Sequence, residues 1–212
     1  PDQVKCIASA IDEQQSEEQM GFRSGRSTED ALLILEEVVS KSFEFRMPLW
    51  LGCLDLSKAF DRIEWNQLFQ ALKEQGVTDE YCSLLAALYY QGQVGSIAQL
   101  GQFDIKREVK QGDVLSPMLF NAGLEMAIRR WKHRLGEHGL LVGGPCQASR
   151  LTNVRFADDL IVYSTDEAEL AEMLDMLAEE LGKVGLSMNS KKCKIFTNSM
   201  AIVNSRVPIF LD

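Results

Sequence analysis

Two short apolar segments that carry aspartates constrain this chain more than any other feature. Residues 154–164 (VRFADDLIVYS) place Asp158 and Asp159 between two runs of β-favouring residues, a pattern that predicts a tight hairpin with both acids at its tip. Residues 48–56 (PLWLGCLDL) are almost wholly apolar and carry Asp55 near their end, as a buried strand does. If the strand and the hairpin pair within one sheet, the three carboxylates meet at one edge of that sheet.

The rest of the sequence alternates helical patterns with short β-type patterns. Ser27 and Asp30 form a capping-box-like helix start, and the apolar residues that follow at helical spacing are Ala31, Leu32, Leu35, Val38 and Val39. Ser116, as an N-cap before Pro117, predicts another helix start. The other expected elements are helices over 64–76, 79–92 and 118–134, a hairpin over 95–109, a helix capped within 164–167 and a strand over 186–197.

This order of elements predicts an α+β fold, an antiparallel sheet with helices packed on one face. The chain has 212 residues, enough for one substantial core, and no internal repeat or linker divides it. We therefore expect a single compact unit, preceded by a helical N-terminal segment.

The net charge of −9 argues against a nucleic-acid partner when taken alone, because phosphate binding needs Lys and Arg. The acids are concentrated at 1–18 and 166–180, whereas residues 19–164 hold 16 Lys and Arg against 18 Asp and Glu. Basic clusters remain at Lys106, Arg107 and Lys110, at Arg129, Arg130, Lys132 and Arg134, and at Lys191, Lys192 and Lys194. These clusters are candidate backbone contacts, although a solvated helix face is the commoner role of such residues.

Cysteine spacing and hydropathy exclude several other classes of protein. The five cysteines and two histidines lack the spacing of a zinc site or a disulfide framework. No stretch approaches the roughly 18 apolar residues of a membrane span. We expect an intracellular protein without a membrane partner and leave its compartment open, the nucleus included. Because the chain begins at Pro1, we also expect a piece of a longer protein.

The three aspartates suit a phosphoryl-transfer site with two metal ions. Two hard divalent cations about 4 Å apart need oxygen ligands that converge from separate elements. Asp55 at a strand end and Asp158 and Asp159 at a hairpin tip meet that need. Alternatively, each acid only caps or makes a turn.

Three ordered motifs together resemble the A, B and C motifs of reverse transcriptases. They are 55–61 (DLSKAFD), 111–117 (QGDVLSP) and 156–159 (FADD). Upstream, 19–28 (QMGFRSGRST) resembles the segment that precedes the first motif in LINE-type, non-LTR retrotransposons, and 185–189 (GLSMN) resembles the fourth palm motif. The resemblance covers roughly residues 19 to 196 and implies an RNA-directed DNA polymerase.

The resemblance also implies a fold and a metal site. Residues 48–212 would form a polymerase palm, and residues 1–47 a partial fingers segment. Asp55 and Asp158 would hold two Mg²⁺ ions, with Mn²⁺ as an alternative, and Asp159 would be the neighbouring acid of the same catalytic metal site. Ser116 and Pro117 would be structural.

Further residues take roles near the nucleotide by the same resemblance. Phe60 is similar to the family's sugar gate, an aromatic ring that excludes the ribose 2′-hydroxyl; the alternative is a plain core aromatic. Gln111 and Gly112 resemble the turn that lines the nucleotide pocket. Lys192 resembles the motif lysine near the leaving pyrophosphate, acting as general acid or as fixed charge, with a solvated strand lysine as the alternative.

Two arginines of the upstream segment are candidate phosphate contacts. Arg23 and Arg26 would bind template or nucleotide phosphates, since a guanidinium binds phosphate bidentately. The alternative is that they pair with nearby acids, namely Glu29, Asp30 or Glu36.

The implied activity is RNA-templated DNA synthesis by two-metal nucleotidyl transfer. Its partners would be an RNA template, a DNA primer, deoxynucleoside triphosphates, and the fingers and thumb regions of a longer polyprotein, without which we expect little activity. The alternatives are an inactive retroelement remnant and a noncatalytic RNA-binding or scaffold module. Group II intron and retron enzymes share the acids, so assignment to the non-LTR subfamily rests on residues 19–30.

Overall fold

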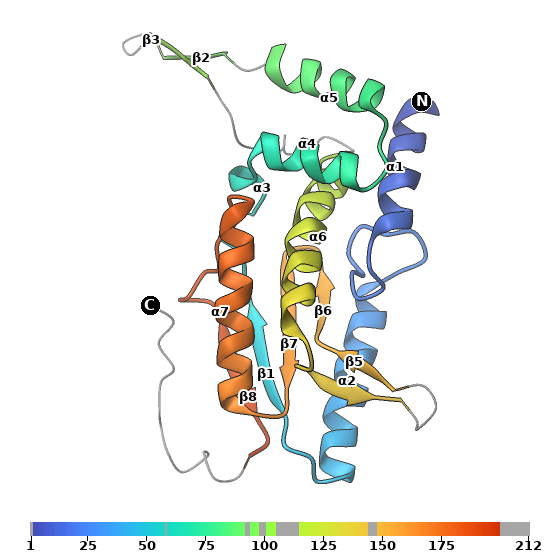
Figure 1. Cartoon of the computed structure of the whole chain (residues 1–212), viewed down its shortest axis with the longest axis vertical. Coiled ribbons are helices and arrows are strands. Elements are labelled where there is room, and N and C mark those ends of the chain that lie inside the picture. The colour runs from blue at the N-terminus through green and yellow to red at the C-terminus, as the bar shows by residue number, and fades with distance from the viewer. Residues whose placement is uncertain are drawn as a thin grey trace.

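The fold is built around a four-stranded antiparallel sheet (Figure 1). A computed structural model describes residues 2–57, 59–91, 94–97, 101–104, 115–143 and 148–199. In sheet order the strands are β6 (Asn153–Phe156), β7 (Asp159–Ser164), β1 (Trp50–Leu54) and β8 (Lys194–Thr197). The apolar β1 is central, pairing with β7 on one side and β8 on the other. The strand and the hairpin therefore pair within one sheet, which is the condition under which the sequence brings the three carboxylates to one edge.

The predicted strand over 186–197 is wrong in length. Only β8 at its end is a regular strand, and residues 190–192 form a turn that returns the chain to the sheet. Leu56 and Met188 form an isolated bridge just beyond the end of β1. The turn places Asn189 and Lys192 beside Asp55.

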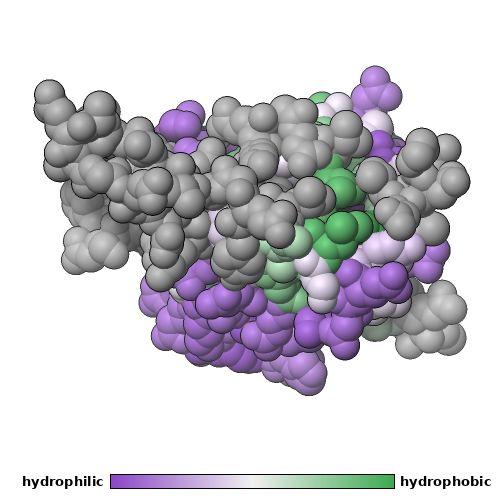
Figure 2. Space-filling model, turned by 90° about the horizontal axis from the view of Figure 1, so that it is seen from above, coloured by the Kyte–Doolittle hydropathy of each residue, from purple (hydrophilic) through white to green (hydrophobic). Residues whose placement is uncertain are grey.

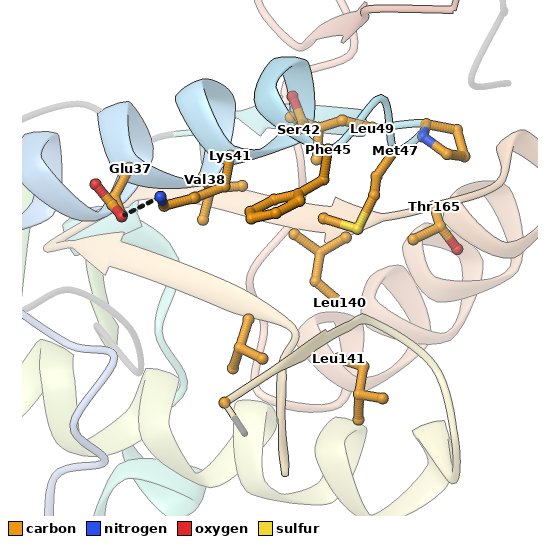
Figure 3. Close-up of a pocket in the computed structure, with 13 residues that line it drawn as sticks. Glu37, Val38, Lys41, Ser42, Phe45, Met47, Leu49, Leu140, Leu141 and Thr165 are labelled. Carbon is orange, nitrogen blue, oxygen red and sulfur yellow. Dashed lines mark ion pairs between the residues drawn. The ribbon is translucent and has the colours of Figure 1, made fainter. Parts of the chain in front are cut away.

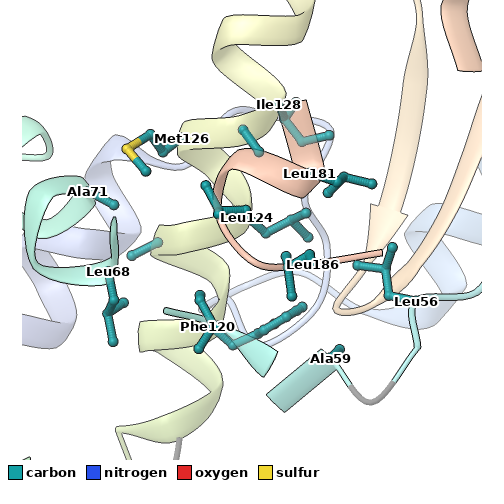
Figure 4. Packing of buried hydrophobic residues seen from close by; sticks show 14 of the residues in the cluster. Leu56, Ala59, Leu68, Ala71, Phe120, Leu124, Met126, Ile128, Leu181 and Leu186 are labelled. Carbon is teal, nitrogen blue, oxygen red and sulfur yellow. The ribbon is translucent and has the colours of Figure 1, made fainter. Parts of the chain in front are cut away.

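Two helices, α6 (Ser116–Leu135) and α7 (Glu167–Lys183), cover one face of the sheet (Figure 1). Their apolar sides form the main core with α3 (Ala59–Arg62) and α4 (Trp65–Glu74), as Figure 4 shows around Phe120 and Leu124. The indole of Trp131 donates to the carbonyl of Met173 at 2.8 Å and so ties α6 to α7.

Of two predicted helix starts, that of α6 departs slightly from the prediction and that of α7 agrees with it. Leu115 is the N-cap of α6 and Ser116 is already helical, so the predicted cap is wrong by one position. The helix α7 begins within the predicted segment, where the carboxylate of Asp166 accepts from the amides of Ala168 and Glu169. Pro117 lies in the first turn of α6, where a missing amide proton costs least.

Helix α2 (Thr28–Glu44) lies against the opposite face of the sheet. The capping box at its start is confirmed, since Ser27 Oγ accepts from Asp30 N at 3.2 Å while the Asp30 carboxylate accepts from Ser27 N at 2.7 Å. The sheet is therefore not covered by helices on one face only. Leu32 was expected on the apolar side of this helix but is 61% exposed. The residues that face the sheet are Ala31, Ile34, Leu35, Val38 and Val39.

The N-terminal helix α1 (Asp2–Gln14) joins the main core. Its Ile7 and Ile11 are buried in the same cluster as the helices that cover the sheet. Helices α1 and α2 thus pack directly on the remainder, and a boundary between partial fingers and palm at residue 47 stays a prediction.

Three smaller features complete the fold. Helix α5 (Asp79–Gln91) confirms the predicted helix, and β2 (Val94–Ile97) pairs with β3 (Gly101–Asp104) within the predicted hairpin. A second hairpin, β4 (Leu140–Val142) with β5 (Ser149–Leu151), was not expected.

The surface is mostly hydrophilic on the side seen at the lower edge of Figure 2, with a smaller apolar area beside it. Within the described part of the chain, no helix is long and apolar enough to cross a membrane. Cys53, Cys82 and Cys193 are free thiols.

Candidate active site

The three aspartates lie at the same end of the sheet. Asp55 directly follows β1, and the β6–β7 hairpin turns through Ala157 and Asp158 because Phe156 pairs with Asp159. In the register of β1 with β7, Leu54 is opposite Leu160, so the next pair is Asp55 and Asp159. Directly opposed residues of an antiparallel pair lie about 4.5 to 5.5 Å apart. Antiparallel pairing therefore brings acids from distant parts of the sequence together.

The proximity of these carboxylates has an electrostatic cost. Burial, followed by the negative charges of Asp158 and Asp55, raises the pKa of Asp159. Among the described residues, however, no group of three or more His, Cys, Asp or Glu side chains is close enough to hold a metal ion. The acids share one edge but are not preassembled into a coordination cage.

The carboxylate of Asp55 is held by the turn before β8. Lys192 Nζ donates to Asp55 Oδ1 at 3.2 Å and Asn189 Nδ2 donates to Asp55 Oδ2 at 3.2 Å, while the Asn189 amide donates to the Asp55 carbonyl at 2.8 Å. The structure thus places Lys192 and Asn189 beside Asp55, while the role of Lys192 near the leaving pyrophosphate stays a prediction. Because the Lys192 side chain is 66% exposed, this ion pair is open to solvent.

The turn that carries Asp158 is held from its buried side. Ala157 has a φ of 58°, in the left-handed region that alanine rarely adopts. The Gln19 side chain, fully buried, accepts from Ala157 N at 3.1 Å and from Gly21 N at 2.9 Å. Its Nε2 faces Asn121 Oδ1 at 3.3 Å and Ala157 O at 3.4 Å. Sequence reasoning missed Gln19 and Asn121 as site residues.

A buried ion pair lies beneath the same turn. Arg155 Nη2 donates to Glu125 Oε2 at 2.9 Å, and both side chains are fully buried. Ser16 bridges the two by donating to Glu125 and accepting from Arg155. Arg155 Nε and Nη1 are buried without a hydrogen-bond partner. The strand that leads to Asp158 thus depends on one buried carboxylate for charge balance.

Comparison with known proteins identifies the family. The family model described as "Reverse transcriptase (RNA-dependent DNA polymerase)" matches residues 2–206. The chain belongs to the reverse transcriptase family.

Several similar proteins are Pol polyproteins of R2 elements, which are non-LTR retrotransposons. The Pol polyprotein of the type-2 element R2DM of Drosophila melanogaster is 30% identical over 179 residues, which are 82% of this chain and 16% of that protein. The type-1 element R2 polyprotein of Popillia japonica is 29% identical over 164 residues, 76% of this chain and 22% of that protein. The chain therefore spans about a fifth of these relatives or less.

Solved structures support the palm-type fold. Telomerase from Candida albicans, in complex with a fragment of telomeric RNA, matches 92% of this chain with a TM-score of 0.65 at 16% identity, over 34% of that chain. Apo telomerase from Candida tropicalis gives a TM-score of 0.65 at 14% identity, over 92% of this chain and 36% of that one. The predicted α+β palm architecture is confirmed.

Reverse transcriptases generally use divalent metal ions, and the donors at this edge have the right chemistry. Mg²⁺ prefers carboxylate oxygens, and the described edge offers them on Asp55, Asp158 and Asp159. Burial first, and then the negative charges of Asp158 and Asp55, raise the pKa of Asp159, and a cation would offset the second of these causes. The residues fit the ion in kind, although their side chains would have to converge further.

The predicted nucleotide-contacting residues of the reverse transcriptase are only partly described. Phe60 lies in α3, half buried, with its ring 4.7 Å from that of Phe120 and tilted by 31°. This packing agrees with the alternative of a core aromatic, and the sugar-gate role stays a prediction. Gln111 and Gly112 lie outside the described residues.

The two arginines occupy different environments. Arg23 is engaged inside the protein, with Nε donating to the Asp12 carboxylate at 2.7 Å and Nη1 donating to the Ser16 carbonyl at 2.8 Å. Its partner is therefore an acid of α1, outside the group that the sequence suggested. Arg26 is exposed.

The basic residues of α6 are paired with acids rather than gathered into an open phosphate-binding face. Their partners are Glu125 for Arg129, Glu74 for Arg130, Glu18 for Lys132, and Glu179 with Glu180 for Arg134. In the third predicted cluster, Lys191, Lys192 and Lys194 are exposed, and Lys192 contacts Asp55.

A groove of about 520 Å³ lies away from the aspartates, between α2 and β4 (Figure 3). Phe45, Met47 and Leu140 line it, and the ion pair of Lys41 with Glu37 closes one end. None of the predicted site residues lines this groove.

Proposed function

We propose that this chain supplies the catalytic acids for RNA-templated DNA synthesis in a non-LTR retroelement protein. The observation that supports this most directly is the register of β1 with β7, which ends with Leu54 opposite Leu160 and so brings Asp55 and Asp159, the next residues of the two segments, to the same end of the sheet as the Asp158 turn. Three carboxylates at one end of a sheet have little structural use, because their mutual repulsion destabilises the fold unless cations offset it.

The roles of the chain's own residues follow from their positions. Asp55 and Asp158 would hold two Mg²⁺ ions, or Mn²⁺ instead, with Asp159 as the third acid of the site. The bound ions would activate the primer 3′-hydroxyl and stabilise the leaving pyrophosphate. Lys192 now neutralises Asp55 and would be released when metal binds, leaving a cation free to face the pyrophosphate as fixed charge or as general acid.

The substrates would be an RNA template, a DNA primer and deoxynucleoside triphosphates. Phe60 would exclude the ribose 2′-hydroxyl, and Gln111 and Gly112 would line the nucleotide pocket. Arg26, exposed on the upstream segment, would contact a phosphate. Arg23 is the weaker candidate because its guanidinium already binds Asp12 and backbone carbonyls.

The first test is metal binding by the 212-residue chain. We expect Mg²⁺ titration, followed by calorimetry, to show binding that Asp158→Asn abolishes and that the exposed control Glu137→Gln leaves intact. Absence of Asp158-dependent binding would contradict the proposal. Because the chain spans a small part of its relatives, primer extension by the isolated chain should be weak. Robust DNA synthesis by it would refute the expectation that the fingers and thumb regions are needed.

A noncatalytic RNA-binding module is the second candidate. The edge strand β8 exposes Lys194 and Phe196 at alternate positions, and Phe196 is 52% exposed. A lysine and an aromatic ring on the same exposed face of a strand can bind the phosphates of unpaired nucleotides and stack on their bases. RNA binding that is lost on Phe196→Ser, in a chain that binds no Mg²⁺, would favour this candidate. An inactive remnant would instead bind the ion without supporting synthesis in the complete polyprotein.

A further inference from the structure

The upstream segment 18–21 runs along the free edge of β6, next to the turn that carries Asp158. Met20 N donates to Arg155 O at 2.8 Å and Arg155 N donates to Glu18 O at 2.8 Å, so the two segments form a short parallel bridge. Gly21 lies so close to the turn that a Cβ there would be 2.2 Å from Ala157 N. The segment therefore touches the turn directly.

Gln19 is the one side chain of this segment that reaches into the turn, and its amide is fully used. One oxygen accepts both the Ala157 and the Gly21 amide protons, at 3.1 and 2.9 Å. The nitrogen faces Asn121 Oδ1 and Ala157 O. Asn121 in turn donates to Gly21 O at 2.8 Å, which fixes the orientation of both amides. Methionine has a similar length but offers neither an amide donor nor a carbonyl acceptor.

The turn needs such support because of its backbone conformation. Ala157, at a φ of 58°, directly precedes Asp158 and sets the direction in which its carboxylate points. A left-handed alanine persists only where its surroundings hold it in place. With both its amide and its carbonyl bound by Gln19, Ala157 is held on both sides of its Cα.

We infer that Gln19 is a positioning residue for Asp158, acting through Ala157, and this inference rests on the proposed function of Asp158 as a metal ligand. Gln19 touches neither the ion nor the substrate. It fixes the left-handed residue, so that the backbone of Asp158 is held at the acidic end of the sheet before the ion arrives and only its side chain has to move toward the ion. Residues of this kind behind a metal ligand commonly alter metal affinity by about 10- to 100-fold when replaced.

The test compares two buried glutamines in the 212-residue chain. Gln19→Met removes the bonds to the turn, whereas the control Gln15→Met removes only a bond to Gln75, at 3.1 Å. The first measurement is amide hydrogen exchange at Ala157 without metal. The second is Mg²⁺ affinity, with the free energy of unfolding measured alongside.

We expect Gln19→Met to speed exchange at Ala157 at least about tenfold and to weaken Mg²⁺ binding by about tenfold or more, and Gln15→Met to change neither by more than about twofold. Where Gln19→Met does not fold, Asn121→Ala carries the test, because it removes the Asn121 bonds to Gln19 and Gly21 that orient the Gln19 amide. Faster exchange with unaltered Mg²⁺ affinity would overturn the positioning role. So would equal effects from both glutamine variants.

These outcomes separate this inference from the proposed function. If the unaltered chain binds no Mg²⁺, the proposed function fails and the inference about positioning a metal ligand fails with it. If the unaltered chain binds Mg²⁺ and the Gln19 variant binds it equally well, only the positioning role fails.

Discussion

The two sides of the aspartate edge are supported in opposite ways. Asp158 follows a residue whose backbone is bound by the buried amide of Gln19, above the buried pair of Arg155 and Glu125. Asp55 is held from the open side, by a lysine whose side chain is 66% exposed and by Asn189. The first support lies inside the protein and the second lies at its surface.

This difference suggests a division of labour within the site. Buried hydrogen bonds in a low-dielectric interior are strong and geometrically fixed, so they suit a ligand that must keep its direction. A solvated ammonium on a flexible stem is easily displaced, so it suits a ligand whose charge must pass to an incoming cation. Variants on the two sides should therefore differ in whether they change stability or ion affinity.

The largest effect should come from the buried charge beneath Asp158. Glu125→Met leaves the Arg155 guanidinium buried without its carboxylate, which should lower the free energy of unfolding by about 3 to 5 kcal/mol. Urea denaturation measures this. The matched control is Glu137→Met, since Glu137 is 93% exposed in its pair with Arg150 and should matter by less than about 1 kcal/mol. Equal losses in the two variants would remove the contrast between interior and surface support.

A smaller loss is expected where the backbone of the upstream segment meets the turn. Gly21→Ala places a Cβ against backbone atoms of Phe156 and Ala157, which cannot rotate away, and should cost about 1 to 3 kcal/mol. Gly182→Ala provides the control, because its Cβ would meet nothing within 4 Å and alanine favours the helix α7. The midpoint of thermal unfolding should therefore fall for Gly21→Ala and rise for Gly182→Ala. A neutral Gly21→Ala would mean that segment 18–21 moves away from the turn at little cost.

The local features of this fold were predictable from sequence because each depends on neighbouring residues. Short stretches of sequence were enough to predict three of them: the acids of the 156–159 turn, the capping box at Ser27 and the amphipathic helix α7. The sequence indicated β1 and the hairpin as short apolar runs that need partners, but it left their pairing with each other as a condition that the structure meets.

The supports of the site could not be predicted because their partners are distant in sequence. Gln19 and Ala157 are 138 positions apart, and a glutamine in a polar loop gives no signal of burial. Asn189 likewise finds Asp55 only after the chain has turned back to β8. Lys192 was indicated by its motif rather than by any local pattern. Leu32 was placed on the wrong side of α2, because helical spacing alone does not say which part of a wide apolar stripe contacts the sheet.

On the Asp55 side, the expected effect concerns ion affinity rather than stability. Lys192→Met removes the cation that competes with Mg²⁺ for Asp55, so Mg²⁺ should bind up to roughly fivefold more tightly, the equivalent of one exposed ion pair. Lys191→Met removes the same charge from the neighbouring position and should change the affinity less. Calorimetric titration of both variants with Mg²⁺ shows whether the change in affinity depends on the ion pair of Lys192 with Asp55 or only on the loss of one positive charge nearby. Weaker binding in the Lys192 variant would show that this lysine supports the metal-bound state instead.

The smallest effect should come from Asp159, where the two sides meet. Burial and the charges of Asp158 and Asp55 raise its pKa in the folded chain, so its ionised form is less favourable there than in the unfolded chain. Without metal, Asp159→Asn should therefore raise the free energy of unfolding by roughly a few tenths of a kcal/mol, a small value because the residue is exposed to solvent. The gain should be complete above the folded-state pKa and vanish as the pH falls below the ordinary value of 3.8.

At saturating Mg²⁺ the unaltered chain should instead have the higher free energy of unfolding. The bound ions stabilise it through the Asp159 carboxylate, which the variant lacks. Denaturation curves at several pH values, with and without Mg²⁺, measure both effects in the same samples. The control is Glu137→Gln, which removes the same charge from an exposed residue that contacts neither a helix cap nor the three aspartates. Asp30→Asn is unsuitable because Asp30 caps α2. A gain in the Asp159 variant that persists at low pH would mean that repulsion among the three acids is not its source, and that Asp159 affects the turn by its shape rather than by its charge.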